Sequence, residues 1–184
     1  MDRWIALDLE TTGLSPTRHE IRELAAVPFG IDEDHTQQVL RFTSADFQSS
    51  ARPATRSRLV ELLRSLAEDA VLVAHNAAFD LAFLAEALRH ARVSSFVIRA
   101  YCTLRLARAV LPDLPGYDLA SLQTTLGLKA GKPHVALNDA RAVAAVFKAL
   151  VRRTGLADEP ALRALHGPPL RVGVACASSM GSRR

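Results

Sequence analysis

The chain has very few cysteines and no long apolar run, and each absence excludes a class of protein. The two cysteines among 184 residues, Cys102 and Cys176, lie far apart and fit neither a disulfide framework nor a zinc-ligand spacing. This favours a reducing compartment, and we expect the cytoplasm. No uninterrupted apolar run approaches the ~20 residues that span a bilayer, and residues 1–4 lack a basic leader followed by an apolar stretch. We therefore expect neither secretion nor contact with a membrane.

Composition and charge indicate one folded domain with a basic end. The chain is 49% apolar and 23% charged, which excludes disordered and collagen-like classes. The net charge of +4 is uneven, because eight basic and two acidic residues follow from Arg141 onward. We expect a domain over residues 1–154 and a loosely ordered basic tail over 155–184, where glycine and proline accumulate. Either a solvated tail or one that contacts phosphates explains its charge.

Alternation of apolar and polar residues predicts an α/β fold. The first three expected strands form an antiparallel meander, and helices and strands then alternate. Asn76 is expected to cap one helix by accepting a hydrogen bond from a free backbone N–H. The expected strands cover 4–9, 20–29, 36–43, 71–74 and 96–101. The expected helices cover 59–66, 76–90, 103–111, 119–126 and 136–154.

Two carboxylates stand side by side at the end of the first strand. Residues at i and i+2 project from the same face of a strand, so Asp8 and Glu10 are neighbours while Leu7 and Leu9 point into the core. Such a pair is repulsive unless a cation lies between its members. Alone, it fits a solvated strand end as well as a metal site.

A third acid, Asp80, lies one turn into the helix that follows Asn76, among apolar neighbours that include Phe79. A carboxylate this close to an apolar stripe needs a partner. An ordinary acid that favours the helix N-terminus is the alternative. That alternative explains Asp80 but not the aromatic residues around it.

The fourth acid, Asp139, comes five residues after His134. On one continuous helix the two side chains would be about 140° apart, because a turn has ~3.6 residues. They meet at one site only if His134 lies on the preceding loop, which Gly131 and Pro133 favour. Each residue alone has an ordinary alternative, a surface histidine and a helix N-terminal acid.

Four carboxylates converging from one strand and two helices require two divalent cations bound through oxygen. Two metal ions ~3.5 to 4 Å apart provide what hydrolysis of a phosphodiester needs, namely an activated water and stabilised charge on both oxygens. A histidine at the rim, with an ordinary pKa near ~6.5, can deprotonate the water at neutral pH. The combination predicts a two-metal phosphodiesterase.

In order and spacing, residues 8–14 (DLETTGL), 75–80 (HNAAFD) and His134 with Asp139 resemble the three motifs of the DEDDh 3′-to-5′ exonucleases. The resemblance covers about residues 3–151. It implies an RNase H-like fold, a mixed five-stranded sheet flanked by helices. The related subclass with a catalytic tyrosine has that residue where this chain has Val135, so the histidine subclass fits.

The resemblance also implies roles for individual residues. The metal ligands correspond to Asp8, Glu10, Asp80 and Asp139, and the general base to His134. They would hold two Mg²⁺ or Mn²⁺ ions.

Four further positions match substrate contacts of that family. Thr11 and Leu14 match residues that contact the terminal nucleotide, with Leu14 as an apolar wedge against its base. Asn76 and Phe79 match residues beside the terminal sugar and base. A turn residue, a core leucine, a helix cap and a core aromatic are the structural alternatives.

The chain departs from the family pattern at two places. Residues 43–50 are short and dissimilar where the family has a longer passage with a proline and a His-Gly-Ile-like element, which affects the expected substrate channel. Cys102 stands where an aspartate is common, although that aspartate is not a metal ligand. The expected activity is therefore unaffected.

The leading hypothesis is a metal-dependent exonuclease that releases 5′-nucleoside monophosphates from single-stranded or frayed 3′ ends of DNA, in proofreading or repair. An RNA-trimming exoribonuclease or oligoribonuclease is the main alternative, and a catalytically silent module that binds nucleic acid or a polymerase is another. A proofreading role requires a polymerase partner in trans. The run 123–128 superficially resembles a sliding-clamp peptide, but Gly127 favours an ordinary helix end there.

Overall fold

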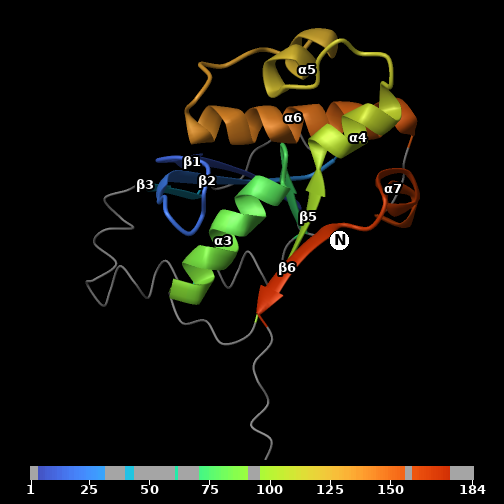
Figure 1. Ribbon diagram of the computed structural model, residues 1–184. Coiled ribbons are helices and arrows are strands. Elements are labelled where there is room, and N and C mark those ends of the chain that lie inside the picture. Colours follow the sequence, from blue (N-terminus) through green and yellow to red (C-terminus); the bar gives the residue numbers. More distant parts are fainter. Residues whose placement is uncertain are drawn as a thin grey trace, which may run out of the picture.

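The computed structural model describes residues 4–31, 40–43, 61, 71–90, 96–155 and 159–174. Its strands are β1 (Trp4–Thr11), β2 (Ile21–Phe29), β3 (Leu40–Thr43), β4 (Val71–Ala74), β5 (Phe96–Cys102) and β6 (Leu170–Val174). Its helices are α3 (Ala78–His90), α4 (Thr103–Val110), α5 (Leu119–Thr125), α6 (Ala136–Thr154) and α7 (Glu159–His166) (Figure 1). The expected helix over 59–66, apart from residue 61, and the dissimilar segment after Thr43 lie outside the described residues. None of the described helices is long and apolar enough to cross a membrane.

The six strands form one mixed sheet in the order β3-β2-β1-β4-β5-β6. Strands β1, β2 and β3 pair antiparallel, which confirms the expected meander. Strands β4 and β5 continue the sheet in parallel to β1, and β6 is antiparallel to β5. The prediction of a mixed α/β sheet is confirmed, but its count of five strands is wrong because β6 adds a sixth.

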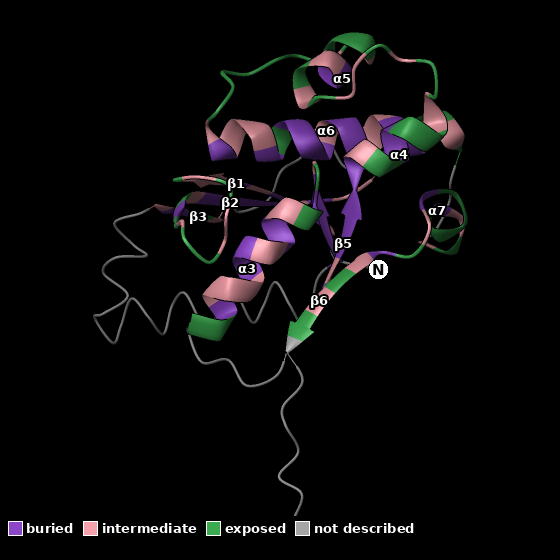
Figure 2. Cartoon of the chain, in the orientation of Figure 1, coloured by how far each residue is buried: buried purple, intermediate pink, exposed green. Residues whose placement is uncertain are grey.

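Helices cover both faces of the sheet, and each face has its own apolar core (Figures 1 and 2). On one face α3 packs over Ile5, Leu7 and Leu9 of β1. On the other, α6 packs over the central strands, with the rings of Trp4 and Phe147 5.2 Å apart. Successive residues of β1 therefore alternate between two buried layers, and the polar residues Asp8 and Glu10 belong to the α6 side.

Glycines end α5 and α6, and at Gly127 this was expected. Helix α6 runs over the predicted residues and stops at Gly155, whose φ of 66° is left-handed. After α5, Gly127 has a φ of 65°. There the N–H of Leu128 donates to the carbonyl of Gln123 at 2.8 Å, closing a Schellman turn. The clamp-like run is thus a helix end, and Gln123 within it is buried.

The expected N-cap of α3 is wrong. The helix begins at Ala78, and the carbonyl of Ala77 accepts its first bond from Leu81 at 3.0 Å. Asn76 instead has a φ of 57° and lies in the turn that precedes the helix. Asparagine tolerates this left-handed conformation because its short polar side chain bonds locally, so it suits a turn as well as a cap.

The expected loose tail is also wrong over 159–174, where the chain forms α7 and β6. Long-range polar contacts fasten α7 to the end of β5. The hydroxyl of Tyr101 donates to Glu159 at 3.0 Å, and the N–H of Cys102 donates to Nε2 of the buried His166 at 3.0 Å. Gly167, with a φ of 83°, then turns the chain into β6. The folded unit therefore extends to Val174, and residues 175–184 lie outside the described part.

Candidate active site

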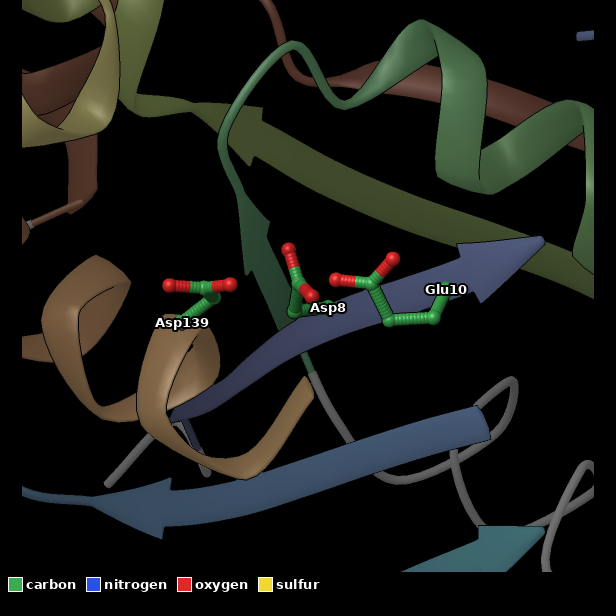
Figure 3. Close-up of side chains that lie close together, drawn as sticks. All are labelled: Asp8, Glu10 and Asp139. Carbon is green, nitrogen blue, oxygen red and sulfur yellow. The ribbon is translucent and has the colours of Figure 1, made fainter. Parts of the chain in front are cut away.

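Three carboxylates meet where the second half of β1 passes the first turn of α6. Asp8, Glu10 and Asp139 each offer one oxygen, and these atoms lie within 4.8 Å of one another. Figure 3 shows the first two side chains rising from β1 and the third reaching toward them from the helix. All three are half-buried. This spacing and oxygen chemistry suit a hard divalent cation.

Backbone geometry places each member of this cluster. Asp8 and Glu10 share a face of β1 because they are two residues apart. Asp139 belongs to the first turn of α6, and its Oδ2 accepts a hydrogen bond of 2.9 Å from the backbone N–H of His134. That bond fixes both the carboxylate and the loop that enters the helix.

Asp80 lies in the first turn of α3 and is only 4% exposed. Burial raises its pKa well above the ordinary value, and the nearby charge of Asp8 raises it further. Hydrogen bonds from backbone N–H groups, including that of Leu9, act in the opposite direction. The structure therefore brings Asp80 beside β1 at Asp8 and Leu9, although it is not one of the three residues grouped within 4.8 Å.

The electrostatics of the cluster favour a bound cation. Burial, together with the nearby charges of Asp139, Glu10 and Glu23, raises the pKa of Asp8 to about 7. Burial also raises the pKa of Glu10, while the nearby His134 lowers it. A divalent cation among these oxygens would remove the repulsion and favour the ionised carboxylates.

His134 lies on the loop before α6, as its spacing from Asp139 requires. Its side chain is exposed and acts electrostatically on Glu10. Its φ is 58°, a left-handed value that is unusual for a residue other than glycine. Because such strain persists only where surrounding contacts impose it, the loop is held in place by its neighbours.

Glu23 is a fifth carboxylate at this site, and the sequence analysis missed it. It lies directly opposite Glu10 in the antiparallel pairing of β1 and β2. Its Oε1 is 2.6 Å from Nε of Arg41 on β3. The expected meander already placed β2 beside β1, so a glutamate of β2 near Glu10 could have been suspected. The bulge between Glu10 and Thr11 shifts the pairing, however, so the residue opposite Glu10 cannot be found by counting from the turn.

The turn after β1 is held by hydrogen bonds and exposes Leu14. Thr11 Oγ1 donates to the carbonyl of Gly13 at 2.7 Å, and the N–H of Glu20 donates to Thr12 Oγ1 at 2.9 Å. A Cβ on Gly13 would come within 2.4 Å of the His19 ring, so a larger residue there would have to displace that ring. Leu14 is 84% exposed. The alternative of a core leucine is therefore excluded.

The other expected substrate residues lie at the start of α3. Phe79 is half-buried and its ring is 4.9 Å from that of Phe83, so it is partly a core residue. Asn76 is exposed in the preceding turn. Next to it, Nδ1 of His75 lies 2.9 Å from the hydroxyl of Thr103, which ties this turn to the start of α4. Their contacts with a nucleotide stay predictions.

Comparisons with known proteins point to nucleases. The model of a family described as exonuclease (RNase T) matches residues 32–147. The PolC-type DNA polymerase III of Thermotoga maritima is 34% identical over 78% of this chain and 11% of its own length. The DNA polymerase III subunit epsilon of Treponema pallidum is 30% identical over 79% of this chain and 75% of its own.

A solved structure has the same fold over its whole length. Exonuclease X, in complex with 5′-overhanging duplex DNA, superimposes with a TM-score of 0.61 at 23% identity. The match covers 91% of this chain and 100% of that one. Several curated relatives are much longer, and the chain spans about a tenth to a quarter of their length.

Proposed function

Because the chain belongs to the exonuclease family, we propose that it hydrolyses DNA from the 3′ end and releases 5′-nucleoside monophosphates, using divalent metal ions. The observation that carries the proposal is the meeting of Asp8, Glu10 and Asp139 within 4.8 Å, with the buried Asp80 beside them. The cluster joins residues of one strand and one helix, and Asp80 of a second helix lies near Asp8. A solvated acidic surface would not need that arrangement.

The donor set fits the proposed metal ions. Asp8, Glu10, Asp80 and Asp139 would hold two Mg²⁺ or Mn²⁺ ions, which prefer carboxylate oxygens. When bound, such ions polarise a water and stabilise charge on the attacking and leaving oxygens of a phosphodiester. The raised pKa of Asp8 supports this assignment, because ionised carboxylates packed together are favoured only when a cation is present.

His134 is proposed as the general base. Its exposure leaves the imidazole open to water, and its electrostatic interaction with Glu10 places it at the rim of the carboxylate cluster. A neutral imidazole there accepts the proton of the attacking water. The loop position matters, because the same side chain within α6 would point away from Asp139.

Selection of the 3′ end is assigned to the residues around the cluster. The exposed Leu14 would wedge against the terminal base, with Phe79 on its other side and Thr11 and Asn76 beside the nucleotide. A base held this way must be unpaired, so a frayed or single-stranded end is the expected substrate.

DNA is preferred to RNA as substrate because the relatives at 30% identity or above include DNA polymerase III proteins. The same similarity supports proofreading with a polymerase in trans and a cytoplasmic location, and both stay proposals. A silent binding module is the less favoured alternative, since it would not need to retain all four carboxylates and His134.

The proposal is tested with matched 5′-labelled substrates: single-stranded DNA, duplex DNA with a 3′ mismatch, and single-stranded RNA. Each is incubated with Mg²⁺, Mn²⁺ or EDTA, beside Asp8→Ala and His134→Ala. We expect a ladder that shortens from the 3′ end, requires metal and falls at least ~100-fold in both variants.

Two results would revise the proposal. Faster loss of RNA than of DNA would move the substrate class to RNA. No ladder from any substrate, with a folded protein and added metal, would leave a binding module as the better explanation.

A further inference from the structure

The loop that presents His134 is tied to its neighbours by three polar side chains. Nε2 of Gln123, on α5, donates to the carbonyl of Lys129 at 3.0 Å. Nδ2 of Asn138, on α6, donates to the carbonyl of Lys132 at 3.0 Å. Asp139 accepts from the N–H of His134. The loop is therefore fixed at its start, middle and end.

The hydrogen bond from Asn138 to the Lys132 carbonyl depends on a close approach of the Gly131 backbone to the Asn138 side chain. A Cβ on Gly131 would lie 3.2 Å from Cβ of Asn138, so only glycine fits there without displacing one of them. Lys132 follows at once and offers its carbonyl to the same asparagine. The contact between Gly131 and Asn138 therefore sets the distance between the loop and α6.

A hollow lies beside the loop. Its volume is about 350 Å³, and residues of the loop and of α6 line it. Its lining includes Gln123, Lys129, Gly131, Asn138 and Arg141. The loop lacks packing on the side of the hollow, so its hydrogen bonds help to hold it, and the strained φ of His134 needs such support.

Asn138 and Asp139 are consecutive on α6 and face about 100° apart. Asn138 reaches the loop at the Lys132 carbonyl, while Asp139 reaches both the N–H of His134 and the carboxylate cluster. We propose that Asn138 is a positioning residue: by holding the Lys132 carbonyl over Gly131, it directs the His134 imidazole toward the carboxylates. This inference rests on the proposed function, because it assigns His134 the role of base.

The test compares Asn138→Ala and Asn138→Leu with wild type and with Thr124→Ala, a matched change on α5. Thr124 is exposed, and its hydroxyl donates to the carbonyl of Ala120 in the same helix at 3.0 Å. Steady-state hydrolysis of single-stranded DNA gives kcat and KM, and thermal melting checks folding. The leucine variant keeps the bulk beside Gly131 but lacks the N–H donor.

We expect both Asn138 variants to lose about 10- to 100-fold in kcat, within the range that a misplaced general base explains. KM should change by less than about 3-fold, and Thr124→Ala should match wild type. In the His134→Ala background, Asn138→Ala should cost nothing further, because the residue it positions is already gone.

Two results would overturn the inference alone: an active wild type with unaffected Asn138 variants, or an equal loss in the presence and absence of His134. An inactive wild type would overturn the proposed function and this inference with it. Gly131→Ala provides an independent check, since its added methyl should push the loop away and lower kcat while Asn138 is intact.

Discussion

Glu10 of β1 and Glu23 of β2 lie directly opposite each other in the sheet, and Arg41 contacts Glu23 at 2.6 Å from the neighbouring strand. Like charges in this position destabilise a sheet unless something compensates them. Arg41 compensates the charge of Glu23. Burial is the main cause of the raised pKa of Asp8 and of Glu10, and the charge of Glu23 contributes to both rises. Glu23 thereby increases the negative charge of the cluster from outside it.

Replacing Glu23 by glutamine should weaken metal binding without abolishing it. Loss of one partly screened charge near the cluster corresponds to ~0.5 to 1 kcal/mol, or roughly a 2- to 5-fold higher Kd for Mn²⁺. Isothermal titration measures this. The control Glu86→Gln removes a glutamate paired with Arg89 on α3 and should leave the Kd unchanged. An unchanged Kd in Glu23→Gln would exclude the electrostatic role.

Asp8→Asn should stabilise the metal-free protein at neutral pH and remove its response to metal. The pKa of Asp8 rises from 3.8 to about 7 on folding, so the unfolded chain loses this proton first as pH increases. The free energy of unfolding therefore falls between about pH 4 and pH 7, by up to ~4 kcal/mol at 1.36 kcal/mol per unit, and less where solvent screens the group.

Thermal melting at pH 8 in EDTA measures this effect. We expect a higher Tm for Asp8→Asn than for wild type, and a rise in Tm with added Mg²⁺ for wild type only. A lower Tm for the variant in EDTA would mean that the carboxylate stabilises the fold through contacts that outweigh its burial.

Leu14→Ser should lower activity at little cost to stability. A side chain that is 84% exposed contributes little to the core, so the free energy of unfolding should change by less than ~0.5 kcal/mol. Loss of a base contact worth ~1 to 3 kcal/mol should reduce kcat/KM by about 5- to 100-fold. Val97→Thr, at another exposed apolar position, is the control. Equal activities in the two variants would remove Leu14 from the substrate contacts.

His166→Ala should destabilise the protein, because it leaves the N–H of Cys102 without its acceptor. A buried unpaired donor costs ~1 to 3 kcal/mol, which corresponds to a fall in Tm of roughly 3 to 10 °C. His90→Ala, at an exposed histidine of α3, is the control.

The pH dependence of this effect follows from burial, which lowers the pKa of His166 below 6.5. Below pH 6.5 the unfolded chain binds the proton more readily, so the contribution of His166 to stability is lost as the pH falls. The Tm difference between wild type and His166→Ala should therefore shrink from pH 7 to pH 5. A constant difference would show that His166 acts through packing alone.

The central elements were predictable because their signals are local. The apolar pattern of α6 and the glycine after it define the helix from Ala136 to Thr154. The five-residue spacing of His134 and Asp139 placed the histidine on a loop. Periodicity and helix-end signals depend only on residues that are close to one another in the sequence.

The parts that sequence reasoning missed depend on distant partners. Pro160 and Gly167 suggested an irregular tail, yet the proline stands in the first turn of α7 and the glycine ends it, both regular positions. Contacts with Tyr101 and Cys102, more than fifty residues earlier, help to fix α7 in place. Asn138 gave no signal because its partner is a backbone carbonyl, which every residue has.

The direction of β6 determines on which side of the sheet a label or tether can be attached. Val174 pairs with Phe96 at the amino end of β5, whereas Asp8 and Asp139 lie toward the carboxyl ends of the parallel strands. A fluorophore or surface tether joined to the chain after β6 starts from the side of the sheet away from the carboxylates. Immobilised molecules, as in an optical-trap or surface-plasmon experiment, would thus keep the carboxylate cluster accessible to a nucleic-acid strand delivered from solution.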